Sequence, residues 1–169
     1  MTAPTAAAGS LRQDARVIGL VTSAHFCSHF YQLVLPTLFV FMVDHYGYTY
    51  LELGALVSVF GIMSAVAQTP IGMLVDKIGA RWPLILATGT LGATIVGYGM
   101  VSSYEAMVVL AVIGGTANAV FHPADFSILA SRVDESRVGR AFSFHAISGN
   151  VGWALAPIIM IPLAEIFGI

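Results

Sequence analysis

Cysteine and charge are both scarce in this sequence. It has a single cysteine, Cys27, and only 9% of its 169 residues are charged. One cysteine excludes an intrachain disulfide and a cysteine-rich zinc cluster. Seven Lys and Arg against nine Asp and Glu give a net charge of −2, so no basic surface indicates nucleic-acid binding. We also find no paired carboxylates or serine–histidine pair of defined spacing, and we expect neither an enzyme nor a cofactor or metal.

Apolar residues are abundant instead and lie in long runs. They make up 57% of the chain, and the mean hydropathy is +0.86, well above that of a soluble domain. A helix needs about 20 such residues to cross a bilayer, and the runs are too long for strands. We predict five spans at about 17–43, 51–75, 83–101, 106–131 and 141–167. The sequence therefore predicts an all-α, multi-pass protein surrounded by lipid.

The charges predict how the chain is oriented in the membrane. We expect residues 1–16, which are small and polar, to form a disordered tail. The apolar run after them is too long for a signal peptide and lacks a cleavage pattern, so we expect it to stay as the first span. Every Lys and Arg falls on one side of the predicted spans: Arg12, Arg16, Lys77, Arg81, Arg132, Arg137 and Arg140. The positive-inside rule makes that side, and the N-terminus, cytoplasmic.

Local patterns on the opposite side agree with this orientation. Thr49 with Glu52, and Ser102 with Glu105, are capping-box pairs that predict the starts of the second and fourth spans. Small residues also recur at every fourth position on the last three spans: Gly89, Ala93, Gly97, Ala111, Gly115, Ala119, Ser148, Gly152 and Ala156. We interpret these rows as sites of close helix packing in lipid. Proline is expected to bend or end helices at Pro70, Pro123, Pro157 and Pro162.

Polar residues interrupt two spans with helical spacing. The first span carries His25, His29 and Gln32, and the fourth carries Asn118, His122 and Asp125. Both sets are spaced i, i+4, i+7 and so lie on one face of a helix. Because polar groups facing lipid are costly, we expect the two faces to share a water-filled cavity that forms a substrate or proton pathway. His145, on the fifth span at a depth similar to that of His122, joins this predicted pathway.

Each of these residues also has a structural interpretation. His25 and His29 could be hydrogen-bonded to neighbouring helices, and His122 could satisfy a backbone carbonyl freed by Pro123. Asp125 lies near the cytoplasmic end, where a gate ion pair is favoured over a proton carrier. A haem or metal protein could use His25 and His29 as an i, i+4 ligand pair, but no single span offers the further ligands such a site needs.

The connection between the second and third predicted spans reads GMLVDKIGARW. It places Gly72, Asp76, Lys77, Gly79 and Arg81 in and beside a short cytoplasmic turn. Gly79 can adopt a left-handed conformation and close this turn. Lys77 or Arg81 is the expected gate partner of Asp125.

This stretch resembles the loop motif G-x-x-x-D-R/K-x-G-R-R/K of the major facilitator superfamily, which lies between the second and third helices of those proteins. It departs from the motif at Ala80, where the family usually has a basic residue. Residues 114–133 and 139–157 resemble helices 4 and 5 of efflux members, especially the fosmidomycin-resistance group. The resemblance implies an inner-membrane secondary transporter with twelve helices in two six-helix halves.

From the resemblance we expect proton-coupled efflux of a small-molecule drug or metabolite by alternating access, in the inner (plasma) membrane. Uptake of a nutrient or organic anion by the same fold is the alternative. Five spans are one short of a six-helix half. We therefore expect a fragment of a longer transporter, with a truncated gene as the alternative, that lacks its C-terminal half and does not transport alone.

Overall fold

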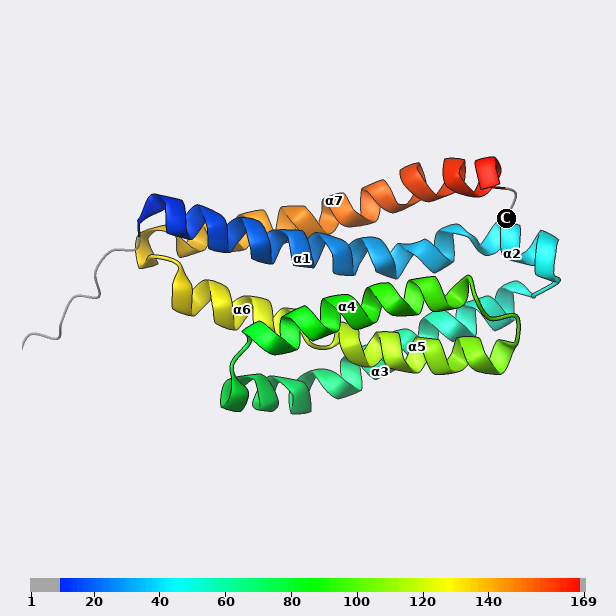
Figure 1. The fold of residues 1–169 in the computed structure, drawn as a ribbon, viewed down its shortest axis with the longest axis horizontal. Helices are drawn as coiled ribbons and strands as arrows, with labels where there is room; N and C mark the ends of the chain where they lie inside the picture. The colour runs from blue at the N-terminus through cyan, green and yellow to red at the C-terminus, as the bar shows by residue number, and fades with distance from the viewer. Residues whose placement is uncertain (1–9, 168–169) are drawn as a thin grey trace, which may run out of the picture.

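The computed structural model describes residues 10–167, and in that range the chain is an elongated bundle of α-helices without strands (Figure 1). The helices are α1 (Leu11–Thr37), α2 (Phe39–Tyr46), α3 (Tyr50–Ile78), α4 (Arg81–Tyr98), α5 (Tyr104–Asn118), α6 (Phe121–Arg132) and α7 (Glu135–Phe167). Two of the predicted spans are thus each built from two helices in succession, α1 with α2 and α5 with α6.

Four helical segments are long and apolar enough to cross a membrane: Leu11–Tyr46, Tyr50–Ile78, Tyr104–Arg132 and Glu135–Phe167. The predicted third span corresponds to α4, which has 18 residues and begins with Arg81. Although α4 is shorter, it packs lengthwise against α1 and α5 inside the same bundle (Figure 1). The prediction of an all-α, multi-pass membrane protein is confirmed, and five is an approximate count of its spans.

The predicted disordered tail is wrong for its last residues. Helix α1 begins at Leu11, and the side chain of Ser10 caps it by accepting a hydrogen bond from the backbone N–H of Gln13 at 3.2 Å. Asp14, which sequence reasoning assigned to a solvated tail, is buried. The Ser10 cap begins the helix locally, and a hydrogen bond from Arg137 on α7 to Asp14 holds its first turn in the bundle. Residues 1–9 of the predicted tail lie outside the described part of the chain.

One of the two predicted capping boxes is confirmed. The Thr49 hydroxyl accepts from the Glu52 N–H at 3.2 Å, and the Glu52 carboxylate accepts from the Thr49 N–H at 2.8 Å. The second prediction is wrong by one residue, since Ser103 rather than Ser102 caps α5. The Ser102 carbonyl instead accepts a hydrogen bond from the hydroxyl of Tyr48.

Prolines coincide with helix ends at two places. Pro123 lies in the first turn of α6, just after the interruption that separates it from α5, and Pro36 lies in the last turn of α1. The helices α3 and α7 run on through their prolines at positions 70, 157 and 162. The α5–α6 interruption sets the direction of the helix that carries His122 and Asp125.

Close backbone approaches hold the bundle together at two seams. A Cβ added to Gly115 on α5 would collide with the backbone of Phe60 on α3. A Cβ on Gly152 of α7 would lie 2.5 Å from the Phe26 carbonyl oxygen of α1. The small-residue prediction holds at these two positions. It does not hold at Gly89, where an added Cβ would have no neighbour within 4 Å.

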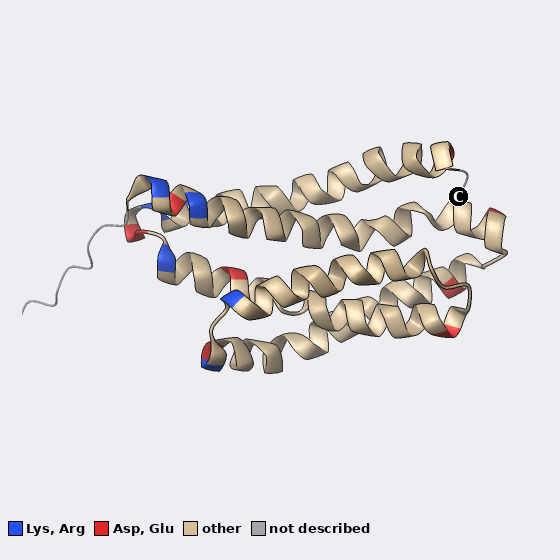
Figure 2. Cartoon of the chain, viewed as in Figure 1, with Lys and Arg blue, Asp and Glu red and all other residues tan. Residues whose placement is uncertain are grey.

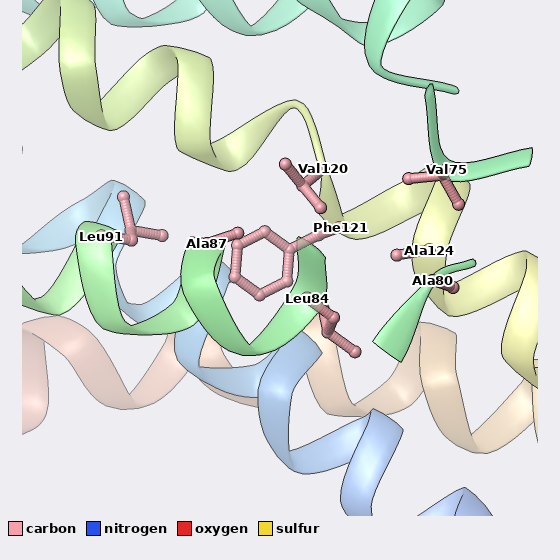
Figure 3. Packing of buried hydrophobic residues seen from close by; sticks show 8 residues of the cluster. All are labelled: Val75, Ala80, Leu84, Ala87, Leu91, Val120, Phe121 and Ala124. Carbon is pink, nitrogen blue, oxygen red and sulfur yellow. The ribbon is translucent and has the colours of Figure 1, made fainter. Parts of the chain in front are cut away.

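Apolar side chains pack into a cluster between α3, α4 and α6, near the turn that joins α3 to α4 (Figure 3). Its buried members are Val75, Ala80, Leu84, Ala87, Leu91, Val120, Phe121 and Ala124. The ring of Phe121 lies against α4 at the centre of this group (Figure 3). A second cluster, around Leu53, Leu56 and Met107, joins α3 to α5 near the other end of the bundle. The first cluster fixes α6 against α4, and the second fixes α5 against α3.

The basic residues gather at one end of the bundle (Figure 2). The start of α1, the α3–α4 turn and the α6–α7 connection bring the described Lys and Arg to this end, although they come from three separate parts of the sequence (Figure 2). The opposite end carries acidic side chains alone among charged residues of the described range (Figure 2). This arrangement is the one that the positive-inside rule requires for a cytoplasmic N-terminus.

Candidate functional site

Four histidines from three helices converge inside the bundle. His25 and His29 lie on α1, His122 on α6 and His145 on α7. The ring centroid of His25 is 3.6 Å from that of His145, 4.3 Å from His29 and 5.3 Å from His122. The sequence placed these residues on the first, fourth and fifth spans and predicted a shared cavity. The structure brings all four together, and we call them, with Asp125, the histidine cluster.

Asp125 is the charged centre of this cluster. Its side chain has no exposed surface, and one carboxylate oxygen, Oδ2, lies 3.1 Å from His145 Nε2 and 3.2 Å from His25 Nδ1. The contact with His145 has hydrogen-bond geometry, whereas His25 Nδ1 is within ion-pair distance but makes no aligned hydrogen bond. The other oxygen, Oδ1, is buried without a hydrogen-bond partner. A buried carboxylate is unfavourable without polar partners, and the imidazoles of His25 and His145 are the groups that face it here.

The predicted gate pair between Asp125 and Lys77 or Arg81 is wrong. Asp125 points to the histidines of α1 and α7, while Lys77 and Arg81 are exposed on either side of the α3–α4 turn. The position of Asp125 along its span is close to the cytoplasmic end, but that position does not determine which face of α6 meets which helix. The predicted role of His122 in satisfying a freed carbonyl also has no counterpart among the hydrogen bonds of the described residues.

The loop motif residues surround a turn that is shorter than predicted. Asp76 and Lys77 belong to the last turn of α3, and the turn itself consists of Gly79 and Ala80. Gly79 adopts a left-handed φ of 84°, as predicted, and its N–H donates to the Val75 carbonyl at 2.8 Å. The guanidinium of Arg81 lies 5.7 Å from the centre of the Trp82 ring.

Gly72 lies one helical turn before Asp76. A Cβ added to Gly72 would stand 3.7 Å from Pro123 on α6. It therefore helps seat α3 against the start of α6. A gating role for the motif residues Gly72, Asp76, Lys77, Gly79 and Arg81 stays a prediction.

A second polar group lies closer to the other end of the bundle. Gln32 Nε2 on α1 donates to Asn118 Oδ1 on α5 at 3.1 Å, and Asn118 Nδ2 donates to Ser64 Oγ on α3 at 2.9 Å. The sequence placed Gln32 and Asn118 on facing stripes, and the structure joins them directly. Ser64 was missed because a lone serine within an apolar span gives no signal of its own.

Two α7 residues that complete the histidine cluster were not predicted. The Trp153 ring is 4.4 Å from that of His29. A Cβ on Gly149 would lie 2.8 Å from His29 Cε1 and 2.9 Å from His25 Nε2. Gly149 thus makes room for the imidazoles. Its spacing of one helical turn from His145 is the signal that could have identified it.

A group of ion pairs at the basic end of the bundle, formed by Asp14, Asp134 and Arg137, was also not predicted from the sequence. Arg137 Nε donates to Asp14 Oδ2 at 2.6 Å, and the Asp134 backbone N–H approaches the same oxygen at 3.3 Å. Hydrogen bonds from the hydroxyl and backbone N–H of Ser136, together with the charge of Arg137, lower the pKa of Asp134. Arg137, which was assigned only a topological role, therefore ties the start of α1 to the start of α7.

The histidine cluster has the chemistry of a metal site as well as that of a proton site. One nitrogen from each of His25, His122 and His145 lies within 4.8 Å of the other two. This trio differs from the His25 and His29 pair that the sequence suggested. Imidazole nitrogens with a carboxylate beside them can share protons or ligate a cation.

Comparison with known proteins accounts for this architecture. The sequence pattern of the Major Facilitator Superfamily matches residues 21–169. The chain belongs to the major facilitator superfamily. The transporter family predicted from the loop motif is therefore confirmed.

Three relatives illustrate the range within the superfamily. The fosmidomycin resistance protein of Escherichia coli K12 is 24% identical over 169 residues, covering 98% of this chain and 41% of that protein. The probable L-galactonate transporter of the same organism is 26% identical over 125 residues, 74% of this chain and 28% of that protein. The uncharacterized transporter MJ1560 of Methanocaldococcus jannaschii is 27% identical over 123 residues, 73% of this chain and 32% of that protein. The chain thus spans less than half the length of each relative.

Proposed function

We propose that this chain is part of a proton-coupled secondary transporter that exports a small molecule by alternating access across the inner (plasma) membrane. The observation that carries the proposal is the histidine cluster. Asp125 and four imidazoles meet where α1, α6 and α7 pack together, inside a bundle whose Lys and Arg gather at one end (Figure 2). Ionisable groups within membrane spans are expensive, and they characteristically mark ion and substrate pathways.

The geometry supports coupling because it links a proton to a helix contact. Asp125 on α6 is held by His25 on α1 and His145 on α7 through one oxygen atom. A proton added to this group changes its net charge and therefore changes how strongly the three helices attract one another. A transporter needs such a dependence, since a ligand shifts a conformational equilibrium only by binding its two states differently.

Similarity guides the choice of substrate and direction. Resemblance to a fosmidomycin resistance protein along 98% of the chain supports export of a drug or metabolite. Resemblance to a probable L-galactonate transporter supports uptake of an organic anion as the second candidate. Gln32, Asn118 and Ser64 offer amide and hydroxyl groups that could hydrogen-bond a polar substrate.

The test is gradient-driven transport by the full-length protein in proteoliposomes, with fosmidomycin and L-galactonate as probes and a pH-sensitive dye reporting proton flux. His122→Gln and Asp125→Asn should each abolish accumulation driven by the pH gradient, while His122→Gln leaves downhill exchange largely intact. His45→Gln is the matched control, because His45 is exposed at the end of α2. Unchanged gradient-driven transport in both cluster variants would assign the cluster to ordinary helix packing.

The proposal also requires the rest of the transporter. Relatives extend well beyond the matched region, since this chain covers only 41% of the fosmidomycin resistance protein, and a central pathway forms between two six-helix halves. We therefore expect residues 1–169 alone to show no accumulation in proteoliposomes. Accumulation driven by a pH gradient with this segment alone would contradict the two-half arrangement.

A further inference from the structure

We propose that the histidine cluster is a binding site for a divalent transition-metal cation of the Zn²⁺ type. His25, His122 and His145 would supply the nitrogen ligands, with Asp125 as the neighbouring carboxylate. This inference goes beyond the proposed function, because a metal could bind here as substrate, inhibitor or structural ion whatever the coupling mechanism. It replaces the His25 and His29 pair considered from the sequence with a set drawn from three helices.

The spacing of the nitrogens is close to that of a metal site. Their ligand atoms all lie within 4.8 Å of one another, whereas nitrogens bound to tetrahedral zinc at 2.0–2.1 Å stand about 3.4 Å apart. The imidazoles therefore need to close by roughly an ångström. His122 is only partly buried and lies 5.3 Å from His25 by ring centroids, so its side chain has room to make this movement.

Asp125 provides the charge that a bound dication needs in this setting. Its Oδ2 lies within 3.2 Å of ring nitrogens of both His25 and His145. Its Oδ1 is buried and has no hydrogen-bond partner. A carboxylate beside metal-binding imidazoles serves as a fourth ligand or holds the rings in the orientation for binding. In either arrangement it offsets part of the positive charge.

Buried polar atoms of this cluster lack hydrogen-bond partners among the described residues. His29 Nδ1 and Asp125 Oδ1 are buried without partners, and His25 Nδ1 lacks an aligned hydrogen bond. Buried polar groups in folded proteins are nearly always paired, so the buried Asp125 Oδ1, beside the three imidazoles, is an unused acceptor that a cation can engage. A nitrogen-rich set selects zinc, copper, nickel or iron, whereas magnesium and calcium prefer oxygen ligands.

The direct test is metal binding by the full-length protein purified in detergent. CoCl₂ is titrated while the visible spectrum is recorded, and bound zinc is measured by mass spectrometry after dialysis against ZnCl₂. We expect one equivalent of either ion and the intense visible bands of low-symmetry cobalt. His122→Gln and His145→Gln should weaken binding at least tenfold, consistent with the loss of a ligand, whereas His45→Gln should bind like the unmodified protein.

Several results would overturn the site. These are the absence of saturable binding of both ions, binding that survives His122→Gln and His145→Gln, or binding that is lost in His45→Gln. Size-exclusion chromatography and circular dichroism establish that each variant is folded. If His145→Gln does not fold, His122→Gln decides the question, because His122 lies at the partly exposed edge of the cluster.

Failure of the metal site and failure of proton coupling can be told apart. Metal binding is measured without a gradient or a substrate. Saturable cobalt binding with no gradient-driven transport would leave the metal site standing and remove proton coupling. Gradient-driven transport by a protein that binds neither ion would remove the metal site alone.

Discussion

The helix α6 presents two faces that differ completely in chemistry. Phe121 and Ala124 pack into the apolar cluster with residues of α3 and α4 (Figure 3). His122 and Asp125, the residues immediately after them in sequence, belong to the histidine cluster formed with α1 and α7. A single short helix thus contacts the apolar cluster with one face and the histidine cluster with the other.

The contrast shows what holds a membrane bundle together. Lipid is as apolar as a leucine side chain, so burying Phe121 contributes through close packing rather than through removal from water. Burying Asp125 is unfavourable in lipid and in protein unless partners surround it. Packing of the apolar face therefore positions α6, and this position holds His122 and Asp125 against α1 and α7. Substitutions on the two faces should separate stability from activity.

The largest expected effect on stability lies on the apolar face. Phe121→Ala removes a ring that is 1% exposed, and we expect the free energy of unfolding to fall by about 3 kcal/mol because a cavity remains. Gradient-driven transport per folded molecule should be retained. Unfolding by sodium dodecyl sulfate, followed by circular dichroism, measures the change. Phe167→Ala, at the exposed end of α7, is the control; an equal loss there would mean that packing around Phe121 is not special.

A smaller loss of stability is expected when the ion pair between Asp14 and Arg137, at the basic end of the bundle, is removed. Asp14→Ala removes the buried partner of Arg137 and leaves the longer contact of Arg137 with Asp134 at 3.6 Å. The free energy of unfolding should fall by about 2 kcal/mol, less than for a fully buried pair because Arg137 is partly exposed. Glu135→Gln, in the first turn of α7, should change it little. The same unfolding assay decides, and equal effects of the two substitutions would contradict a specific tie.

The smallest effect on stability, and a large one on activity, is expected at Gly149. In Gly149→Ala the new methyl group would meet ring atoms of His25 and His29 at 2.8–2.9 Å, and these rings can move aside. We expect the free energy of unfolding to fall by about 1 kcal/mol, and gradient-driven transport to fall at least tenfold. Gly139→Ala on the same helix is the control, since its methyl group has no neighbour within 4 Å. Normal transport by Gly149→Ala would show that the ring positions are not critical.

Features governed by residues close together in the chain were accessible from the sequence. Apolar run length placed the spans, the basic residues indicated the orientation, and the Thr49 and Glu52 pair marked the start of α3. Gly79 closes the α3–α4 turn with a left-handed φ of 84° as expected. Helical spacing also identified which of the polar residues share a face, because that spacing is set by the geometry of one helix.

The identity of partners was decided by the tertiary structure alone. Spacing within α6 could not show that Asp125 meets His25 and His145 instead of Lys77 or Arg81. Nor could it show that Asp14 belongs to α1 and pairs with Arg137, 123 residues away. These contacts depend on how helices rotate and cross, and that depends on the summed packing of many side chains and on glycines such as Gly149 and Gly152. The sequence by itself determined where the long apolar spans lie and which of their faces are polar, whereas only the packed bundle determined which polar faces meet.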